Sequence, residues 1–238
     1  MMIRTFHGFR RLTDALLLII LIGLPFVRLN GESALRFDVP TLRLLFFGTG
    51  IWMQDFFIVL VAVIFLTFFI LFVTTILGRV WCGWLCPQTV LMDVTTFMEA
   101  FKKQGYPGLI AAAFAGLAAS AALSASFISY FVSPYDLPLI LRTGGPSATI
   151  VVWSWAVIAV VLYLDLIALR RGFCAAACPY AKMQGVLFDD RTLMVAFDSA
   201  RTEECRECLA CVKVCPLGID IRKGTQMACI HCAECVDA

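Results

Sequence analysis

Charged side chains are scarce in this chain. Asp, Glu, Lys and Arg make up only 15% of its 238 residues, whereas hydrophobic residues make up 61%. Soluble globular chains carry about 25% charged residues, so this composition favours insertion into a membrane. The few charges nearly cancel, to a net charge of +2, and no basic block is interleaved with aromatic residues. Both features argue against a nucleic-acid partner.

A cysteine pattern suited to disulfides is also lacking. The chain has eleven cysteines, an odd number, and they cluster at short spacings instead of being spread through loops. This distribution favours reduced thiols that bind metal over a disulfide framework.

The densest cysteine cluster lies in the C-terminal tail. Residues 205–216 fit the pattern C-x2-C-x2-C-x3-C-P, with which bacterial ferredoxins hold iron–sulfur clusters. Residues 229–235 repeat its first three cysteines, and a fourth would fall one position after Ala238. The alternative, a structural zinc ribbon, uses paired C-x2-C knuckles and needs no triplet followed by Cys-Pro. The tail is therefore predicted to hold iron–sulfur clusters.

The spacing also predicts how these ligands are shared. In paired motifs the fourth cysteine of each run binds the other cluster. One 4Fe–4S cluster would then have four thiolates, from Cys215, Cys229, Cys232 and Cys235. The other would have three, from Cys205, Cys208 and Cys211. We expect the sequence to be a C-terminally truncated piece of a longer chain; a three-iron cluster or an open iron is the alternative.

Four apolar segments are candidates to cross a membrane. The clearest is 56–77, which contains no charge. Two others cover about 109–132 and 148–169, and a shorter one, about 12–29, resembles an uncleaved signal segment. We predict an α-helical multi-pass membrane bundle of four spans within residues 1–187. An α+β bacterial-type ferredoxin module follows in residues 188–238.

A second cysteine pattern occurs twice. Residues 79–87 and 171–179 both read R-x-W/F-C-x3-C-P, each after the second helix of a helix pair, which indicates a degenerate duplication. Cysteines four positions apart share one face of a helix. The two pairs could converge into one four-thiolate site or act as two dithiols, and soft thiolates select Cu(I), zinc or cluster iron. Alternatively, small cysteines simply pack the helix ends. The cysteines concerned are Cys82, Cys86, Cys174 and Cys178.

The distribution of Lys and Arg predicts the orientation. Three precede the first span, three lie between spans two and three, and nine follow span four, against three and one in the remaining loops. The positive-inside rule then puts the N-terminus and the ferredoxin module in the cytoplasm, with all eleven cysteines. Asp165 lies inside the fourth span, where a functional role and pairing with Arg170 are both open.

Longer phrases of the sequence resemble the cytochrome c oxidase accessory protein family, known as CcoG, FixG or RdxA. They are residues 78–88 (GRVWCGWLCPQ), 178–181 (CPYA), 184–189 (QGVLFD), 218–222 (GIDIR), Gln226 and the stretch 229–238. The resemblance covers nearly the whole chain. It implies a polyferredoxin of the bacterial inner membrane that reduces Cu(II) to Cu(I) for assembly of cbb-type oxidases. Members of the family continue into a further span and an immunoglobulin-like periplasmic domain, neither of which this sequence contains.

By position, the resemblance implies that the seven tail cysteines bind two 4Fe–4S clusters and that the four C-x3-C-P cysteines belong to the family's motifs. Our first hypothesis is a cupric reductase in which those four are catalytic and bind copper as ligand or substrate. It would work with a cytoplasmic electron donor, copper-handling and oxidase assembly proteins, and membrane lipid. The alternative is a NapH- or NosR-like subunit that relays electrons between quinol and a partner reductase. A third reading is an assembly scaffold with redox-inert clusters.

Overall fold

The computed structural model describes residues 5–29, 31–52, 56–102, 104–170, 172–187, 192–224 and 226–238. The chain divides into two compact units. Unit 1 comprises Met1–Leu17, Phe65–Val94 and Arg170–Ala238, and unit 2 comprises Leu18–Ile64 and Thr95–Leu169.

Three helical segments within the described residues are long and apolar enough to cross a membrane. They are α2 (Phe56–Leu77), α6 (Tyr106–Ile128), and Pro146–Leu169, which joins α8 (Pro146–Leu164) to the π-helical turn η3 (Asp165–Leu169). They match three of the predicted spans, so a helical multi-pass membrane fold is confirmed. The fourth, 12–29, does not qualify: the helix there, α1 (Thr5–Gly23), carries Arg10, Arg11 and Asp14. These charges and the break at Pro25 leave too short an apolar run.

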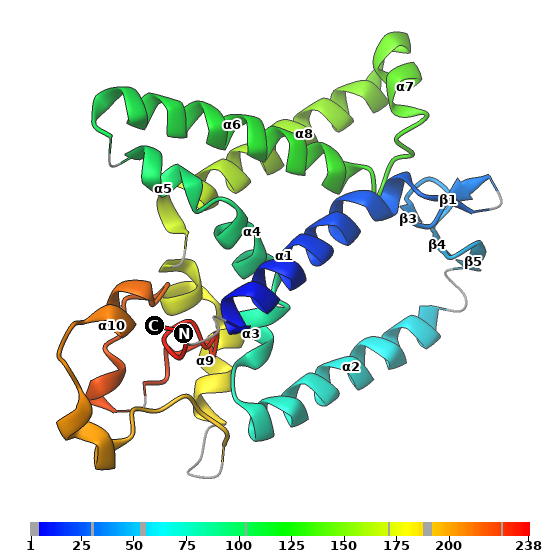
Figure 1. Ribbon diagram of the computed structural model, residues 1–238. Helices are drawn as coiled ribbons and strands as arrows, with labels where there is room; N and C mark the ends of the chain where they lie inside the picture. The colour runs from blue at the N-terminus through cyan, green and yellow to red at the C-terminus, as the bar shows by residue number, and fades with distance from the viewer. Residues whose placement is uncertain are drawn as a thin grey trace. The chain divides into compact units, whose positions relative to one another are not determined.

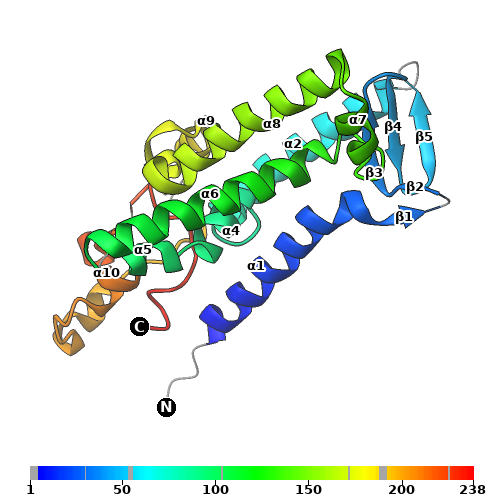
Figure 2. The ribbon, with the colours of Figure 1, turned by 90° about the horizontal axis from the view of Figure 1, so that it is seen from above.

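In unit 2, α6 and α8 lie side by side and run antiparallel (Figures 1 and 2). Small residues on α6 allow this approach, since a Cβ on Gly116 would come within 2.7 Å of the Ile167 side chain. The Ser124 hydroxyl, fully buried, donates to the Trp155 carbonyl at 2.8 Å. The short helix α5 (Phe97–Lys102) precedes α6 in the sequence, and α7 (Leu137–Thr143) lies between α6 and α8.

The segment before α2 folds into two small antiparallel sheets. One pairs β1 (Arg28–Leu29) with β2 (Glu32–Ser33); the other is a meander of β3 (Leu35–Asp38), β4 (Arg43–Phe46) and β5 (Thr49–Trp52). The Arg43 guanidinium lies 3.3 Å from the centroid of the Trp52 ring, its cross-strand partner. No sheet was predicted here, because the strands are short and show no regular alternation of polar and apolar residues.

Unit 1 contains all eleven cysteines. Its short elements are α3 (Val80–Trp84), α4 (Pro87–Val94), η4 (Phe173–Ala177), α9 (Pro179–Val186), η5 (Ser199–Glu204), α10 (Ala210–Val214) and η6 (Ile221–Lys223). The described parts of the tail, 192–224 and 226–238, contain no strand, so the β component of the predicted α+β module is absent there. The backbone turns too often around the cysteines for strands to form: Glu207, Leu209, His231 and Ala233 all have positive φ.

Candidate metal sites

The two C-x3-C-P copies share one backbone geometry. In each, the N–H of the second cysteine donates to the carbonyl of the aromatic residue five positions earlier, from Cys86 to Trp81 and from Cys178 to Phe173, both at 2.9 Å. The proline that follows begins an eight-residue helix, α4 or α9. Proline is well suited to this position because the first N–H groups of a helix have no partner within it. The repeat seen in the sequence is therefore also a repeat of local structure.

The spacing predicted that the two cysteines of each pair share a face of one helix. In the structure they do not. Cys82 lies in α3, but Cys86 lies in the break before α4. Cys174 lies in the π-helical turn η4, and Cys178 is the N-cap residue of α9. The prediction was wrong because the residue before a proline disfavours helical backbone, so the helix ends there and a new one begins.

All four of these thiols lie near one another. The pKa of Cys174 is raised to about 11, first by burial and then by Cys86, Cys178 and Cys82. The charges of both copies thus act on one thiol, so the four cysteines lie in one neighbourhood, although among the described residues no three of them converge as ligands of a single metal ion. We call these four side chains the thiol quartet.

Cys82 is the most deeply placed member of the thiol quartet, with 8% of its surface exposed. Its thiol donates to Oε1 of Gln184 at 3.1 Å, and Nε2 of Gln184 donates to the Thr74 hydroxyl at 2.9 Å. The Thr89 hydroxyl donates to the Cys82 carbonyl at 2.6 Å. Sequence reasoning gave no role to Gln184 or Thr74. The available signal was that Gln184 opens one of the phrases that carry the family resemblance.

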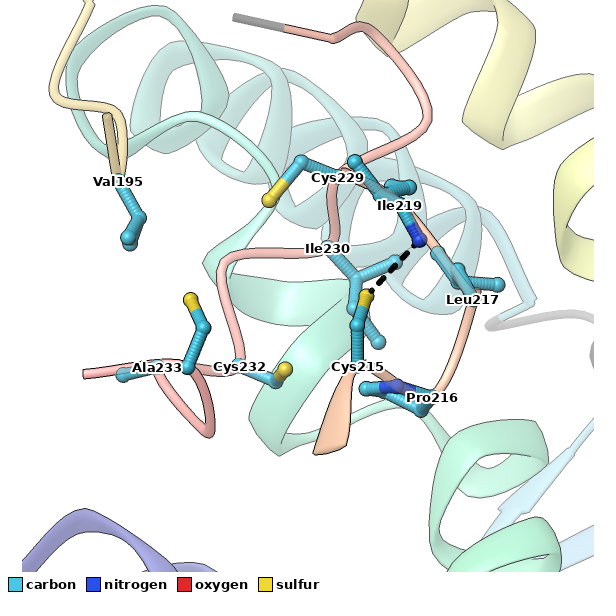
Figure 3. Close-up of a pocket in the computed structure, with 10 residues that line it drawn as sticks. Val195, Cys215, Pro216, Leu217, Ile219, Cys229, Ile230, Cys232 and Ala233 are labelled. Atoms are coloured by element: carbon cyan, nitrogen blue, oxygen red, sulfur yellow. Dashed lines mark hydrogen bonds between the residues drawn. The ribbon is translucent and has the colours of Figure 1, made fainter. Parts of the chain in front are cut away.

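The second cysteine run of the tail surrounds a pocket with about 320 Å³ of empty space, partly open to solvent (Figure 3). Figure 3 shows Cys229 and Cys232 on one loop, opposite Cys215. Together with Cys235 they are the four cysteines of the pocket wall, and the same four were predicted to complete one cluster. The remaining wall is apolar: Val195, Pro216, Leu217, Ile219, Ile230 and Ala233.

This donor set suits a 4Fe–4S cluster, in which each iron takes one thiolate. The Ile219 N–H donates to the Cys215 sulfur at 3.4 Å, the type of contact that tunes cluster potentials. Among the described residues, no three His, Cys, Asp or Glu side chains are arranged to hold a single metal ion. A cluster does not need such convergence, because its thiolates bind different irons.

The first cysteine run lies in a different environment. Cys208 is exposed, Cys205 and Cys211 are half-buried, and none of the three lines the pocket. The structure therefore does not gather all seven tail cysteines into one site.

The loop around the second run is held by the N-terminal helix. The His7 backbone N–H donates to Asp237 at 2.8 Å, and its ring Nδ1 lies 2.9 Å from the Glu234 carboxylate. Arg10, 3% exposed, donates to Glu234 at 3.2 Å and also to Asp93. A buried cation between two carboxylates fixes α1 against the loop that carries Cys232 and Cys235.

Known families match the same segments. A 4Fe-4S dicluster domain matches residues 169–204 and 199–238, and a 4Fe-4S binding domain matches residues 57–102. Each C-x3-C-P copy and both tail runs fall within these matches.

Several characterised proteins are similar over most of the chain. Protein RdxA of Cereibacter sphaeroides is 30% identical over 87% of this chain and 50% of its own length. Nitrogen fixation protein FixG of Rhizobium meliloti is 29% identical, over 87% and 46%. The ferredoxin-type protein NapH of Haemophilus influenzae is 21% identical, over 71% and 62%. No solved structure matches the chain.

The chain spans about half the length of RdxA and FixG. Within that half it combines apolar membrane helices with the cysteine motifs of 4Fe–4S proteins. Together, these similarities support a FixG/RdxA-like family of membrane polyferredoxins.

Proposed function

We propose that the protein is a cupric reductase that reduces Cu(II) to Cu(I) near the thiol quartet, for assembly of cbb-type cytochrome c oxidase. Soft thiolates prefer Cu(I), so Cys82, Cys86, Cys174 and Cys178 favour the reduced product. Reduction takes one electron per copper ion and requires no bond to the substrate other than metal–sulfur bonds.

The observation that carries this proposal is a shared apolar wall. Cys82 of the thiol quartet and Cys232 of the tail pocket belong to one buried cluster with Ile230, against which Tyr180 and Leu217 pack. A second small cavity, lined by Cys174, shares Pro216, Leu217 and Ile230 with the tail pocket. Aliphatic side chains therefore keep water out between the two thiol sites and hold them close together, which supports electron transfer between them.

The tail cysteines are proposed as ligands of two resident clusters. Cys215, Cys229, Cys232 and Cys235 would hold one 4Fe–4S cluster, which supplies one-electron chemistry when bound. Cys205, Cys208 and Cys211 would supply ligands of the other.

The proposed location is the bacterial inner membrane, with the N-terminus and the tail in the cytoplasm. The excess of Lys and Arg on that side supports it. A cytoplasmic donor would then reach the exposed Cys208 region, and copper-handling and oxidase assembly proteins would be the partners that supply and receive copper.

Copper reduction by the full-length protein tests the proposal. Protein reduced with dithionite and freed of excess reductant is mixed with Cu(II), and Cu(I) is detected with bathocuproine disulfonate. Replacing all four cysteines of the thiol quartet with alanine should reduce the rate to that of buffer, while the absorbance of the tail clusters stays unchanged. An undiminished rate in this variant would contradict the copper assignment.

The similarity to NapH favours a second candidate, relay of electrons between quinol and a partner reductase. It is distinguished by anaerobic oxidation of a reduced quinol analogue in proteoliposomes. Oxidation coupled to cluster reduction, with no copper reduction, would favour the relay.

A further inference from the structure

One buried cation lies against the loop of the second cysteine run. Arg79 is 3% exposed and stands three residues before Cys82, at the start of the first C-x3-C-P copy. Its guanidinium Nη1 donates to the Met227 carbonyl at 2.8 Å, and its backbone N–H donates to Nδ1 of His231 at 3.1 Å. Side chain and backbone thus bind the segment that carries Cys229, so Arg79 belongs to both sites at once.

Two glycines allow this close approach. A Cβ on Gly78 would overlap the His231 ring, and a Cβ on Gly83 would overlap the Ile230 carbonyl oxygen. Next to Gly83 in the sequence, the Trp84 indole N–H donates to the His231 carbonyl at 3.2 Å. The first C-x3-C-P copy and the cluster loop therefore pack backbone against backbone, and Arg79 is enclosed in their interface.

The Arg79 charge lies close to cysteines of both sites. Arg79 stands three residues before Cys82, and the Met227 carbonyl that its guanidinium binds lies two residues before Cys229. An arginine guanidinium is always charged in proteins. Its Nε–H is also buried and has no acceptor among the described residues, so a donor remains available to an anionic sulfur.

We propose that Arg79 is a positioning residue that couples the thiol quartet electrostatically to the pocket of Cys215, Cys229, Cys232 and Cys235. Each site becomes more negative when it is reduced, and a buried positive charge beside it favours the reduced state. Because one guanidinium lies beside both sites, it raises both reduction potentials together. The difference between the two potentials, which drives electron transfer from one site to the other, therefore stays small. This inference rests on the proposed function in treating the two sites as redox partners.

Redox titration of the full-length protein, followed by electron paramagnetic resonance of the clusters, is the main test. Arg79→Gln should lower the equilibrium constant for reducing the pocket cluster about tenfold, equivalent to about 59 mV for one electron. Lys182→Gln is the matched control, because Lys182 is an exposed cation on α9 and its loss changes the net charge equally. Its effect should stay below about twofold because water and salt screen it. Equal shifts in the two variants would overturn the proposal.

Arg79→Lys separates charge from shape. Lysine keeps the positive charge and loses the planar fork, so the reduction constant should remain within about threefold of the wild-type value. A shift of about tenfold in Arg79→Lys would show that Arg79 acts through packing alone and would overturn the proposal. This outcome can be measured even if Arg79→Gln fails to assemble its cluster.

Copper binding gives an independent readout on the other site. In competition with bathocuproine disulfonate, Arg79→Gln should hold Cu(I) about tenfold more weakly than the wild type. An unchanged affinity would count against coupling to the thiol quartet. If the wild-type protein binds no copper, the proposed function fails, whereas the shift in cluster potential still decides the role of Arg79.

Discussion

The two cysteine runs of the tail have the same spacing and different surroundings. In the first run Cys208 is exposed, whereas in the second Cys232 is 7% exposed. Burial, acting first, raises the pKa of Cys232 and Cys235 to about 11. The spacing of cysteines therefore specifies what they bind, and the segments packed over them specify how dry and how electrically isolated the site is.

The residues that pack over the second run come from distant parts of the chain. His7 and Arg10 bind Glu234, while Arg79 and Trp84 bind the segment around His231. In the first run, Ala210 occupies the position of Glu234, and Glu207, at the position of His231, is exposed. The difference makes the second run the inner site, next to the thiol quartet, and the first run the one that a soluble donor can reach. Four experiments would break or sharpen this comparison.

The largest effect is expected from single ligand substitutions. Cys232→Ala should remove the pocket cluster and about half of the bound iron, because one of four thiolates is lost from an apolar site. Cys208→Ala should leave the pocket cluster intact. Iron analysis and electron paramagnetic resonance measure both. If Cys208→Ala also empties the pocket, the two runs form one cooperative site and the comparison fails.

Thiol labelling of cluster-free protein is expected to differ next most strongly. With a pKa of about 11, Cys232 should react with iodoacetamide about 100-fold more slowly near pH 8 than an ordinary thiol. Burial favours the neutral form of the Cys232 thiol. The neutral thiol therefore contributes to stability below the ordinary thiol pKa, and this contribution is lost as the pH rises through about 11. Labelling of Cys232 should increase across that window. Mass spectrometry with exposed Cys208 as internal reference measures it, and equal rates would refute the difference in burial.

Glu234→Gln should destabilise unit 1 by about 1–3 kcal/mol, because it weakens the contacts of Arg10 and His7 and leaves a buried cation less well compensated. The control is Glu207→Gln, the same substitution at an exposed position of the first run, which should change stability by less than about 0.5 kcal/mol. Thermal unfolding measures both variants, and similar losses of stability would contradict a specific role of Glu234 in the docking of α1.

An effect on stability of similar size is expected at Gly83. Gly83→Ala forces a methyl group against the Ile230 carbonyl and should cost about 1 kcal/mol or more, with faster loss of the pocket cluster in air. Gly8→Ala, in the open on α1, should be neutral or stabilising by up to about 1 kcal/mol. Cluster absorbance over time and the melting temperature report both. Equal behaviour of the two variants would contradict the close approach.

Several features of the structure were predicted from local patterns in the sequence. The charge-free run 56–77 is a helix with those bounds because its length and composition leave no other way to satisfy its backbone in lipid. The repeated C-x3-C-P gave the duplication, since aromatic, cysteine and proline at fixed spacing produce the same turn in each copy. The ferredoxin spacing selected the four cysteines that line one pocket, and their role as ligands stays a prediction.

Other features depend on contacts that no local pattern encodes. Over the first predicted span, α1 uses Arg10 to hold the loop of the second run, a contact that no periodic pattern in the sequence indicates. The β meander and the Cys82–Gln184 contact were also not predicted, because each joins residues whose spacing in the sequence shows no periodic pattern.

The sequence alone thus determined the chemistry of this protein: apolar helices that cross a membrane and cysteines spaced for iron–sulfur clusters. Only the tertiary structure decided which cysteine run is buried, and that Arg79 lies between it and the thiol quartet. The physical reason is distance along the chain. Arg79 and His231 are 152 residues apart, and a buried charge acquires its role from what surrounds it in space.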